Sequence, residues 1–96
     1  MKPLELHPQA LAEAEAAAAW YAGRDLRVAA RFAAELEATL DLIAEAPNRW
    51  PAYLYGTRRL PLTRFPYVVL YREEPSSILV VAVAHAKRKP DYWRSR

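Results

Sequence analysis

Residues 65–71 read FPYVVLY, and this stretch decides the fold class of the chain. Five apolar or aromatic residues, Tyr67 to Tyr71, follow one another with no charge between them. A short run that is apolar on both faces predicts a β-strand in the middle of a sheet, covered on both sides. The residues Thr63-Arg64-Phe65-Pro66 form a turn ahead of it, so we expect this strand to begin at Tyr67.

Two more strands are predicted beside this one. Residues 78–84 read ILVVAVA, rich in β-branched residues, and the turn Glu74-Pro75-Ser76-Ser77 separates them from the central strand. On the other side, residues 53–62 predict a strand in which Pro61 indicates a sheet edge or a bulge. Short links between successive strands favour an antiparallel meander.

The N-terminal half predicts a strand followed by two helices. Residues 2–6 alternate between polar and apolar, which predicts a short strand. Strong helix formers fill residues 8–22, and Gly23 stands where a left-handed C-terminal cap is expected. Asp25 is the expected N-cap of a second helix, which Pro47 ends. With so short a link, the two helices fold back as an antiparallel hairpin.

Each helix carries an apolar stripe that predicts its buried face, because residues at i, i+3 or i+4 and i+7 share one side. The stripes are Leu11, Ala14, Ala18 and Tyr21 in the first helix and Ala29, Phe32, Leu36, Leu40 and Ile43 in the second. Acids off the stripes are expected to form a solvated face: Glu13, Glu15, Glu37 and Asp41. The order β-α-α-β-β-β predicts an α+β fold, an antiparallel sheet with the helical hairpin packed on one face.

Length and composition predict one globular domain spanning residues 1–96. Of the 96 residues, 53% are hydrophobic and 26% charged, the balance of a folded chain. There is no cysteine, which excludes disulfides and thiolate metal sites, and no signal core or membrane-length apolar run. We expect a soluble, cytoplasmic protein with no metal, no other cofactor and no membrane partner.

The charge is divided unevenly between the two halves. Residues 1–46 hold four basic and eight acidic residues, a net charge of −4. Residues 47–96 hold ten basic and three acidic residues, a net charge of +7. A positive field concentrated on one half predicts an anionic partner, either nucleic acid or an acidic protein segment. Charge alone does not choose between them.

The residue types exclude several kinds of site. Two glycines cannot build a phosphate-binding loop, two histidines lack a third metal ligand, and no serine lies in a nucleophile elbow. What remains is a cluster of cations and rings at one end of the sheet: Arg58, Arg59, Arg64, His85, Lys87, Arg88, Lys89, Tyr92, Trp93, Arg94 and Arg96. Because neighbours on a strand point to opposite faces, only one of Arg58 and Arg59 can join this surface.

Two interpretations of this basic end stay open. Cations bind phosphate and rings stack on bases, so the set suits RNA, with His85 or Tyr92 as a proton carrier. The structural alternative makes His85 a hydrogen-bonded strand end, and Tyr92 and Trp93 a cover for the sheet.

Four motifs, in register over nearly the whole chain, carry a resemblance to a known family. They are IAEAP at residues 43–47, RRL at 58–60, FPYVVLY at 65–71 and HAKRKPDYW at 85–93. With the order of elements, they resemble the RelE/ParE superfamily of bacterial toxins. The resemblance implies the toxin of a type II toxin–antitoxin pair, often called a plasmid stabilisation protein. It also implies a cognate, ParD-like antitoxin whose acidic, amphipathic segment binds an apolar groove along the hairpin and sheet, and through which alone the toxin meets DNA.

The two branches of the superfamily imply different targets. RelE-type toxins cleave messenger RNA in the ribosome, whereas ParE-type toxins poison DNA gyrase and are not enzymes. RelE-type enzymes carry an Arg directly after the Tyr of the central strand, where this chain has Val68. Their preceding strand carries paired lysines, where this chain has Arg59 and Pro61. Half of the nuclease set is absent, which favours a ParE-like toxin that is not an enzyme over a nuclease; a non-toxic, antitoxin-binding module is the third alternative.

The predicted site is the basic end of the sheet. The residues expected to carry toxicity are Arg58, Arg59, Arg64, His85, Lys87, Arg88, Tyr92 and Trp93. For a nuclease, the expected catalytic residues are Arg59, His85, Arg88 and Tyr92.

Overall fold

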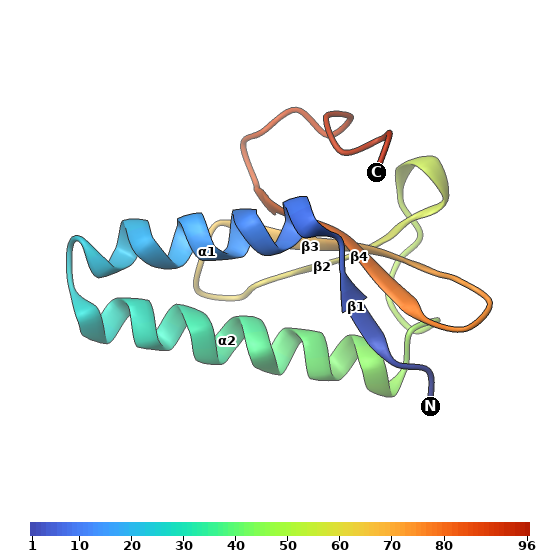
Figure 1. Cartoon of the computed structure of the whole chain (residues 1–96), viewed down its shortest axis with the longest axis horizontal. Helices are drawn as coiled ribbons and strands as arrows, with labels where there is room; N and C mark the ends of the chain where they lie inside the picture. The colour runs from blue at the N-terminus through green and yellow to red at the C-terminus, as the bar shows by residue number, and fades with distance from the viewer.

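The computed structural model describes all residues from Met1 to Arg96, and it contains the predicted order of elements. They are β1 (Leu4–Leu6), α1 (Pro8–Ala22), α2 (Leu26–Glu45), the short 3-10 helix η1 (Leu54–Gly56), β2 (Arg58–Pro61), β3 (Tyr67–Glu73) and β4 (Ile78–His85). The two helices lie side by side next to the sheet (Figure 1). The α+β fold predicted from the sequence is therefore confirmed. Neither helix is long and apolar enough to cross a membrane.

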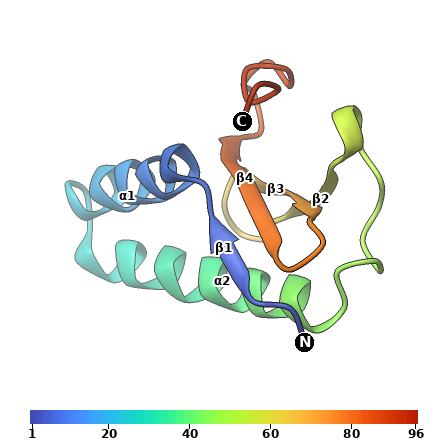
Figure 2. The same ribbon diagram turned by 45° about the vertical axis from the view of Figure 1, so that its right-hand side comes forward.

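The sheet has the strand order β1-β4-β3-β2. Strands β2, β3 and β4 are antiparallel neighbours, as predicted. Strand β1 differs from the expected all-antiparallel sheet, because it pairs in parallel with β4, with Leu4 opposite Ile78. Figure 2 shows β1 running beside β4. The alternation in residues 2–6 marks a strand but cannot select its partner, which lies beyond both helices in the sequence.

The link between the helices follows one prediction and departs from another. The carboxylate of Asp25 accepts the N–H of Arg27 at 2.8 Å, which is the predicted N-cap of α2. The expected left-handed cap at Gly23 is wrong, because its φ of −65° and ψ of −13° are right-handed. The N–H groups of Arg24 and Asp25 both bond to the carbonyl of Tyr21, so the chain turns directly into the next helix.

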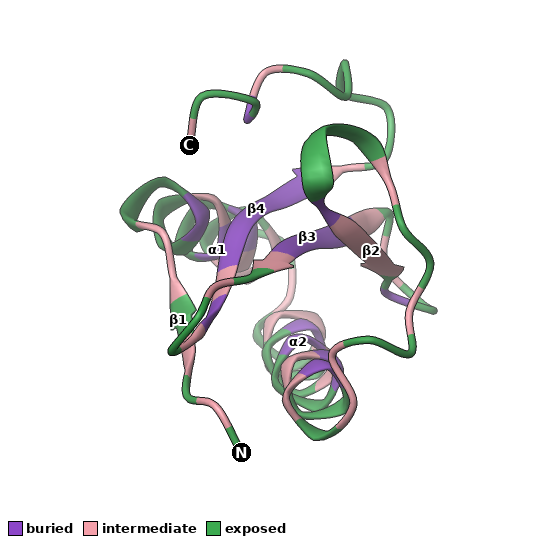
Figure 3. Ribbon diagram, turned by 90° about the vertical axis from the view of Figure 1, so that its right-hand side faces the viewer, coloured by how far each residue is buried: buried purple, intermediate pink, exposed green.

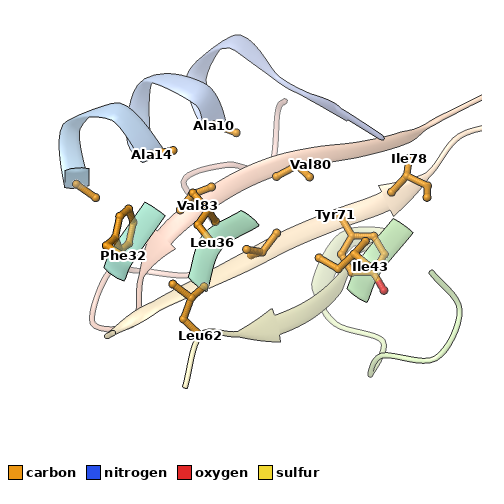
Figure 4. Close-up of a cluster of buried hydrophobic side chains, with 12 residues drawn as sticks. Ala10, Ala14, Phe32, Leu36, Ile43, Leu62, Tyr71, Ile78, Val80 and Val83 are labelled. Atoms are coloured by element: carbon orange, nitrogen blue, oxygen red, sulfur yellow. The ribbon is translucent and has the colours of Figure 1, made fainter. Parts of the chain in front are cut away.

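One face of the sheet packs against both helices. From α2 this core takes Phe32, Leu36 and Ile43, as predicted, and from the sheet it takes Val69, Tyr71, Ile78, Val80 and Val83. Figure 4 shows these α2 side chains filling the space between the helix and the strands. The apolar stripe of α2 therefore decides how the hairpin sits on the sheet.

The buried side of α1 agrees in part with the predicted stripe, since Ala14 is buried and Ala18 and Tyr21 pack against the core. The buried residues are Ala10, Ala14 and Ala17, whereas Leu11 is 48% exposed. Alanine lies on every side of this helix, so the pattern offers no distinct apolar face from which to predict its orientation. Small side chains at the contact let α1 approach β4 closely.

The opposite face of the sheet has its own core. It consists of Val68, Leu70, Val81, Ala82, Ala84 and Trp93. Strand β4 contributes two successive residues because of a bulge: Leu70 pairs with Ala82 and Tyr71 with Val80, so Val81 is the extra residue. Figure 3 shows the sheet lying between α2 and the C-terminal segment, which comes over this second face.

The strand predicted over residues 53–62 is shorter in the structure. Only Arg58–Pro61 form β2, and residues 54–56 form the 3-10 turn η1. Tyr55 and Gly56 both have positive φ, 59° and 73°, which a strand does not allow. The hydroxyl of Thr57 donates to the carbonyl of Leu54 at 2.6 Å and closes the turn.

Candidate functional site

The C-terminal tail, residues 86–96, folds into two turns on the second face of the sheet. The N–H of Arg88 bonds to the carbonyl of His85 at 3.0 Å, and the N–H of Arg94 bonds to that of Asp91 at 3.0 Å. Trp93, only 2% exposed, anchors the tail in the second core. Figure 2 shows the tail turning back beyond the end of β4. The structural role considered for Trp93, a cover over the sheet, is thus what the structure contains.

Glu13 of α1 holds this tail from the other side. Its carboxylate accepts the hydroxyl of Tyr92 at 2.7 Å and both terminal nitrogens of Arg96, at 3.0 and 3.1 Å. Arg88 lies at 3.9 Å from the same carboxylate. The side chains of Glu13 and Arg96 are 16% and 10% exposed. The prediction that Glu13 belongs to a solvated face is therefore wrong, because three tail side chains converge on it.

Glu13 and Arg96 also form hydrogen bonds with the open edge of β4. Strand β1 ends at Leu6, so beyond Val80 the edge of β4 that faces away from β3 has no neighbouring strand. The carboxylate of Glu13 accepts the N–H of Val83 at 3.0 Å, and Arg96 donates to the carbonyl of Val81 at 3.1 Å. Two side chains thus satisfy backbone groups that would otherwise be buried without partners.

The ring of Tyr92 lies between two guanidinium groups. The guanidinium carbon of Arg88 is 3.6 Å from the ring centroid, and that of Arg96 is 5.0 Å away. Burial raises the pKa of the Tyr92 hydroxyl far above its ordinary value, and the hydrogen bond to Glu13 and its negative charge raise this pKa further. At neutral pH this hydroxyl is a fixed hydrogen-bond donor.

A small cationic pocket lies between β2, the end of β4 and the tail, with a volume of about 50 Å³. Its cations are Arg59, Arg88 and Lys89, its rings are Tyr53, His85 and Trp93, and no acid is among the residues that line it. Arg59 reaches this face because it stands opposite Leu70 in the β2–β3 pair. Its Nε is buried without a hydrogen-bond partner, and its guanidinium carbon is 5.2 Å from the Tyr53 ring. A pocket of this kind attracts anionic groups.

The structure separates the other predicted site residues from this pocket. Arg58 points to the opposite face, where its guanidinium donates to the carbonyl of Trp50 at 2.6 Å, so the rule that only one of Arg58 and Arg59 joins the surface is confirmed. Arg64 lines a different depression, next to Glu35. Lys87 is exposed in the turn after β4 and does not line the pocket.

His85 lies at the rim with its ring already engaged. Its Nδ1 accepts the N–H of Lys87 at 3.2 Å, and its ring meets that of Tyr67 edge to face at 5.2 Å. These contacts are the structural role considered for a histidine at a strand end. No three His, Cys, Asp or Glu side chains come together in a way that could hold a metal ion.

Sequence reasoning missed Glu13, Tyr53 and Tyr55, and it gave Arg96 no role of its own within the basic cluster. No local pattern distinguishes Glu13 from Glu15, since its partners lie at the far end of the chain. Tyr53 and Tyr55 fall in the segment expected to be a strand, where they would have read as ordinary sheet residues. Nothing in the sequence distinguishes Arg96 from the other tail cations, although its side chain is less exposed than that of Arg88, the other tail residue paired with Glu13.

A groove of about 470 Å³ runs between α1 and the end of β4. Its apolar lining includes Ala16, Ala17, Trp20, Tyr21, Tyr67 and Val83. Its polar lining consists of the cation Arg88, the acid Glu13 and the ring of His85. A second apolar depression of about 260 Å³ lies between the two helices, with Glu15 and Glu37 beside it. The first groove therefore joins an apolar floor to one cation and one acid, whereas the second is lined by two acids and no cation.

Comparisons with known proteins agree with this geometry. Residues 4–90 match a family model described as the ParE toxin of type II toxin-antitoxin system, parDE. The protein named Toxin RelE1 from Caulobacter vibrioides is 40% identical over 68 residues, which are 69% of this chain and 73% of that protein.

A solved structure has the same fold. A chain of the chromosomal ParDE TA system from P. aeruginosa aligns with a TM-score of 0.80 and 19% identity, over 91% of this chain and 98% of that one. At this identity the likeness concerns the fold alone. The family match, in contrast, extends over the helices, the sheet and the start of the tail. The chain belongs to the ParE toxin family of type II toxin–antitoxin systems.

Proposed function

We propose that this toxin arrests growth in the cytoplasm by binding and inhibiting DNA gyrase, and that it does not cleave RNA. The observation that carries the proposal is the hydrogen bond from the Tyr92 hydroxyl to Glu13. RNA cleavage by the 2′-hydroxyl needs groups that move protons near neutral pH. The Tyr92 hydroxyl already donates to Glu13, and its pKa is raised by burial and by this carboxylate, so it is a poor general base at that pH.

The two arginines among the nuclease candidates offer charge rather than proton transfer. Arg59 and Arg88 stay protonated at any physiological pH, so they stabilise anions without acting as acids or bases. The Nδ1 of His85 accepts the N–H of Lys87 in the tail turn, which leaves only Nε2 of this ring for proton transfer. Together with the family match, this set favours binding to an acidic surface of a target protein.

We assign the contact with the target to the cationic pocket and its rim. Arg59, Arg88 and Lys89 supply the positive charge, His85 lies beside them, and Tyr92 and Trp93 hold the backbone that presents these side chains. In this proposal Arg58 and Arg64 make no contribution to toxicity, since they lie elsewhere.

The antitoxin is proposed to occupy the groove between α1 and β4. An acidic, amphipathic segment fits an apolar floor that has Arg88 beside Glu13 at one end better than it fits the depression beside Glu15 and Glu37, which no cation lines. A segment in this groove would also cover Arg88, which explains neutralisation by direct obstruction. Trp20, 52% exposed in this groove, is then an antitoxin anchor, and Trp20→Ala should weaken antitoxin binding without reducing toxicity.

The test is induction of the chain without antitoxin, followed by measurement of plasmid supercoiling and of transcript integrity in the same cells. We expect loss of negative supercoiling and trapped gyrase–DNA complexes while transcripts stay intact. Transcripts cut only where ribosomes occupy them would reject the proposal in favour of a nuclease. Normal growth would leave a module that binds antitoxin and nothing else.

A further inference from the structure

The loop of residues 53–57 presents a tyrosine in a strained backbone conformation. Tyr55 has φ 59° and ψ 41°, and no other residue except glycine has a positive φ in this chain. The left-handed region is unfavourable for a residue with a bulky side chain. Hydrogen bonds from the N–H of Tyr53 to the carbonyl of Thr57 at 2.7 Å, and from the Thr57 hydroxyl to Leu54, hold the loop in this form.

Burial of apolar side chains in the core does not explain this strain. Tyr55 is 45% exposed and its neighbour Leu54 is 41% exposed. The Tyr55 ring meets Trp93 edge to face at 5.8 Å, and the guanidinium of Arg94 lies over it at 4.5 Å from the centroid. The loop therefore fixes a ring and an aliphatic side chain together on the surface, next to the cationic pocket that Tyr53 and Trp93 line.

We propose that Leu54 and Tyr55 are an anchor that inserts into an apolar pocket on an acidic surface of the target protein. The proposal rests on the proposed function, in which the target is a protein. Tyrosine and arginine are the residues that most often dominate protein interfaces, and Arg59 and Arg94 flank this anchor with positive charge. A protein fits better than a nucleic acid, because Arg94 already covers a face of the ring on which a base would stack.

The test compares Leu54→Ala and Tyr55→Asn with the control Leu26→Ala, all induced in cells without antitoxin. Leu26 is 74% exposed at the start of α2 and lines none of the pockets, so its change removes similar apolar surface elsewhere. Asparagine adopts the left-handed conformation more readily than tyrosine, so Tyr55→Asn keeps the loop. Each variant is also purified with its antitoxin, and its melting temperature is expected within about 5 °C of the wild type.

The expected result is that both loop variants restore colony formation at least about tenfold, whereas Leu26→Ala arrests growth like the wild type. Growth arrest by the folded Leu54→Ala and Tyr55→Asn variants would overturn the anchor, whatever the wild type does to gyrase. If both variants lose the arrest but the wild type leaves gyrase active, the anchor is supported and gyrase is rejected as the target. A wild type that does not arrest growth would overturn both proposals.

Discussion

Replacement of Glu13 by alanine is the most revealing single change, because one carboxylate joins α1, β4 and the tail. The change removes acceptors for Tyr92, for Val83 and for both terminal nitrogens of Arg96. Arg96, whose side chain is 10% exposed, would keep its charge without a counterion. Its Nε already lacks a hydrogen-bond partner.

The magnitude follows from these contacts. Removing one partner of a buried ion pair costs about 3–5 kcal/mol, since the other charge stays buried and unpaired. The tail can escape part of this penalty by leaving the sheet and taking Arg96 into water. That escape gives up the burial of Trp93, a large apolar surface. We therefore expect the free energy of unfolding to fall by about 3 kcal/mol, accompanied by release of residues 86–96.

The assay is urea unfolding of Glu13→Ala beside Glu15→Ala, combined with amide hydrogen exchange of the tail. Glu15 lies two residues away in the same helix and is exposed, so its change should cost less than about 0.5 kcal/mol. In Glu13→Ala we expect the N–H of Arg96 and of Arg94 to lose their protection. Equal stability of the two variants within about 1 kcal/mol, with a protected tail, would refute the role given to Glu13.

Three further outcomes follow from the structure. Above pH 10 the free energy of unfolding should fall by on the order of 1 kcal/mol per pH unit. The reason is that burial raises the pKa of Tyr71 to about 12, so the unfolded chain loses this proton first. A urea midpoint that stays constant between pH 10 and 11.5 would contradict this prediction. Phe32→Ala should lower the free energy of unfolding by about 3–5 kcal/mol, since Phe32 is 1% exposed among three aromatic rings. Calorimetry measures this loss, and a loss below about 1 kcal/mol would show that the core repacks. Arg59→Ala should abolish growth arrest with little loss of stability, whereas Arg64→Ala should leave the arrest intact. Equal toxicity of the two variants in a plating assay would show that the cationic pocket is not the site of toxicity.

The sequence pattern predicted the parts of the fold that depend on local periodicity. FPYVVLY is apolar on both faces because β3 lies between two cores, and its strand extends to Glu73. The stripe of α2 was correct because Phe32, Leu36 and Ile43 stand among charged residues. The stripe of α1 was correct for Ala14, Ala18 and Tyr21 but not for Leu11, because alanine on every side of this helix gives little contrast between its faces.

The candidate site was predictable in composition but not in arrangement. The basic tail and Arg59 come together as expected, since β2 alternation turns Arg59 toward the tail. Glu13 could not be found, because its partners are contributed by the distant tail and no pattern in α1 marks them. The turn at Tyr55 could not be predicted either, since tyrosine is common in strands and a positive φ is not expected of it.

In the proposed function, this chain inhibits gyrase by binding through its tail face. The most direct measurement is supercoiling of relaxed plasmid by purified gyrase, with the purified toxin added alone or after incubation with its antitoxin. We predict that the toxin blocks supercoiling, that the antitoxin restores it, and that Arg59→Ala is inactive. Full supercoiling in the presence of excess folded toxin would contradict the account.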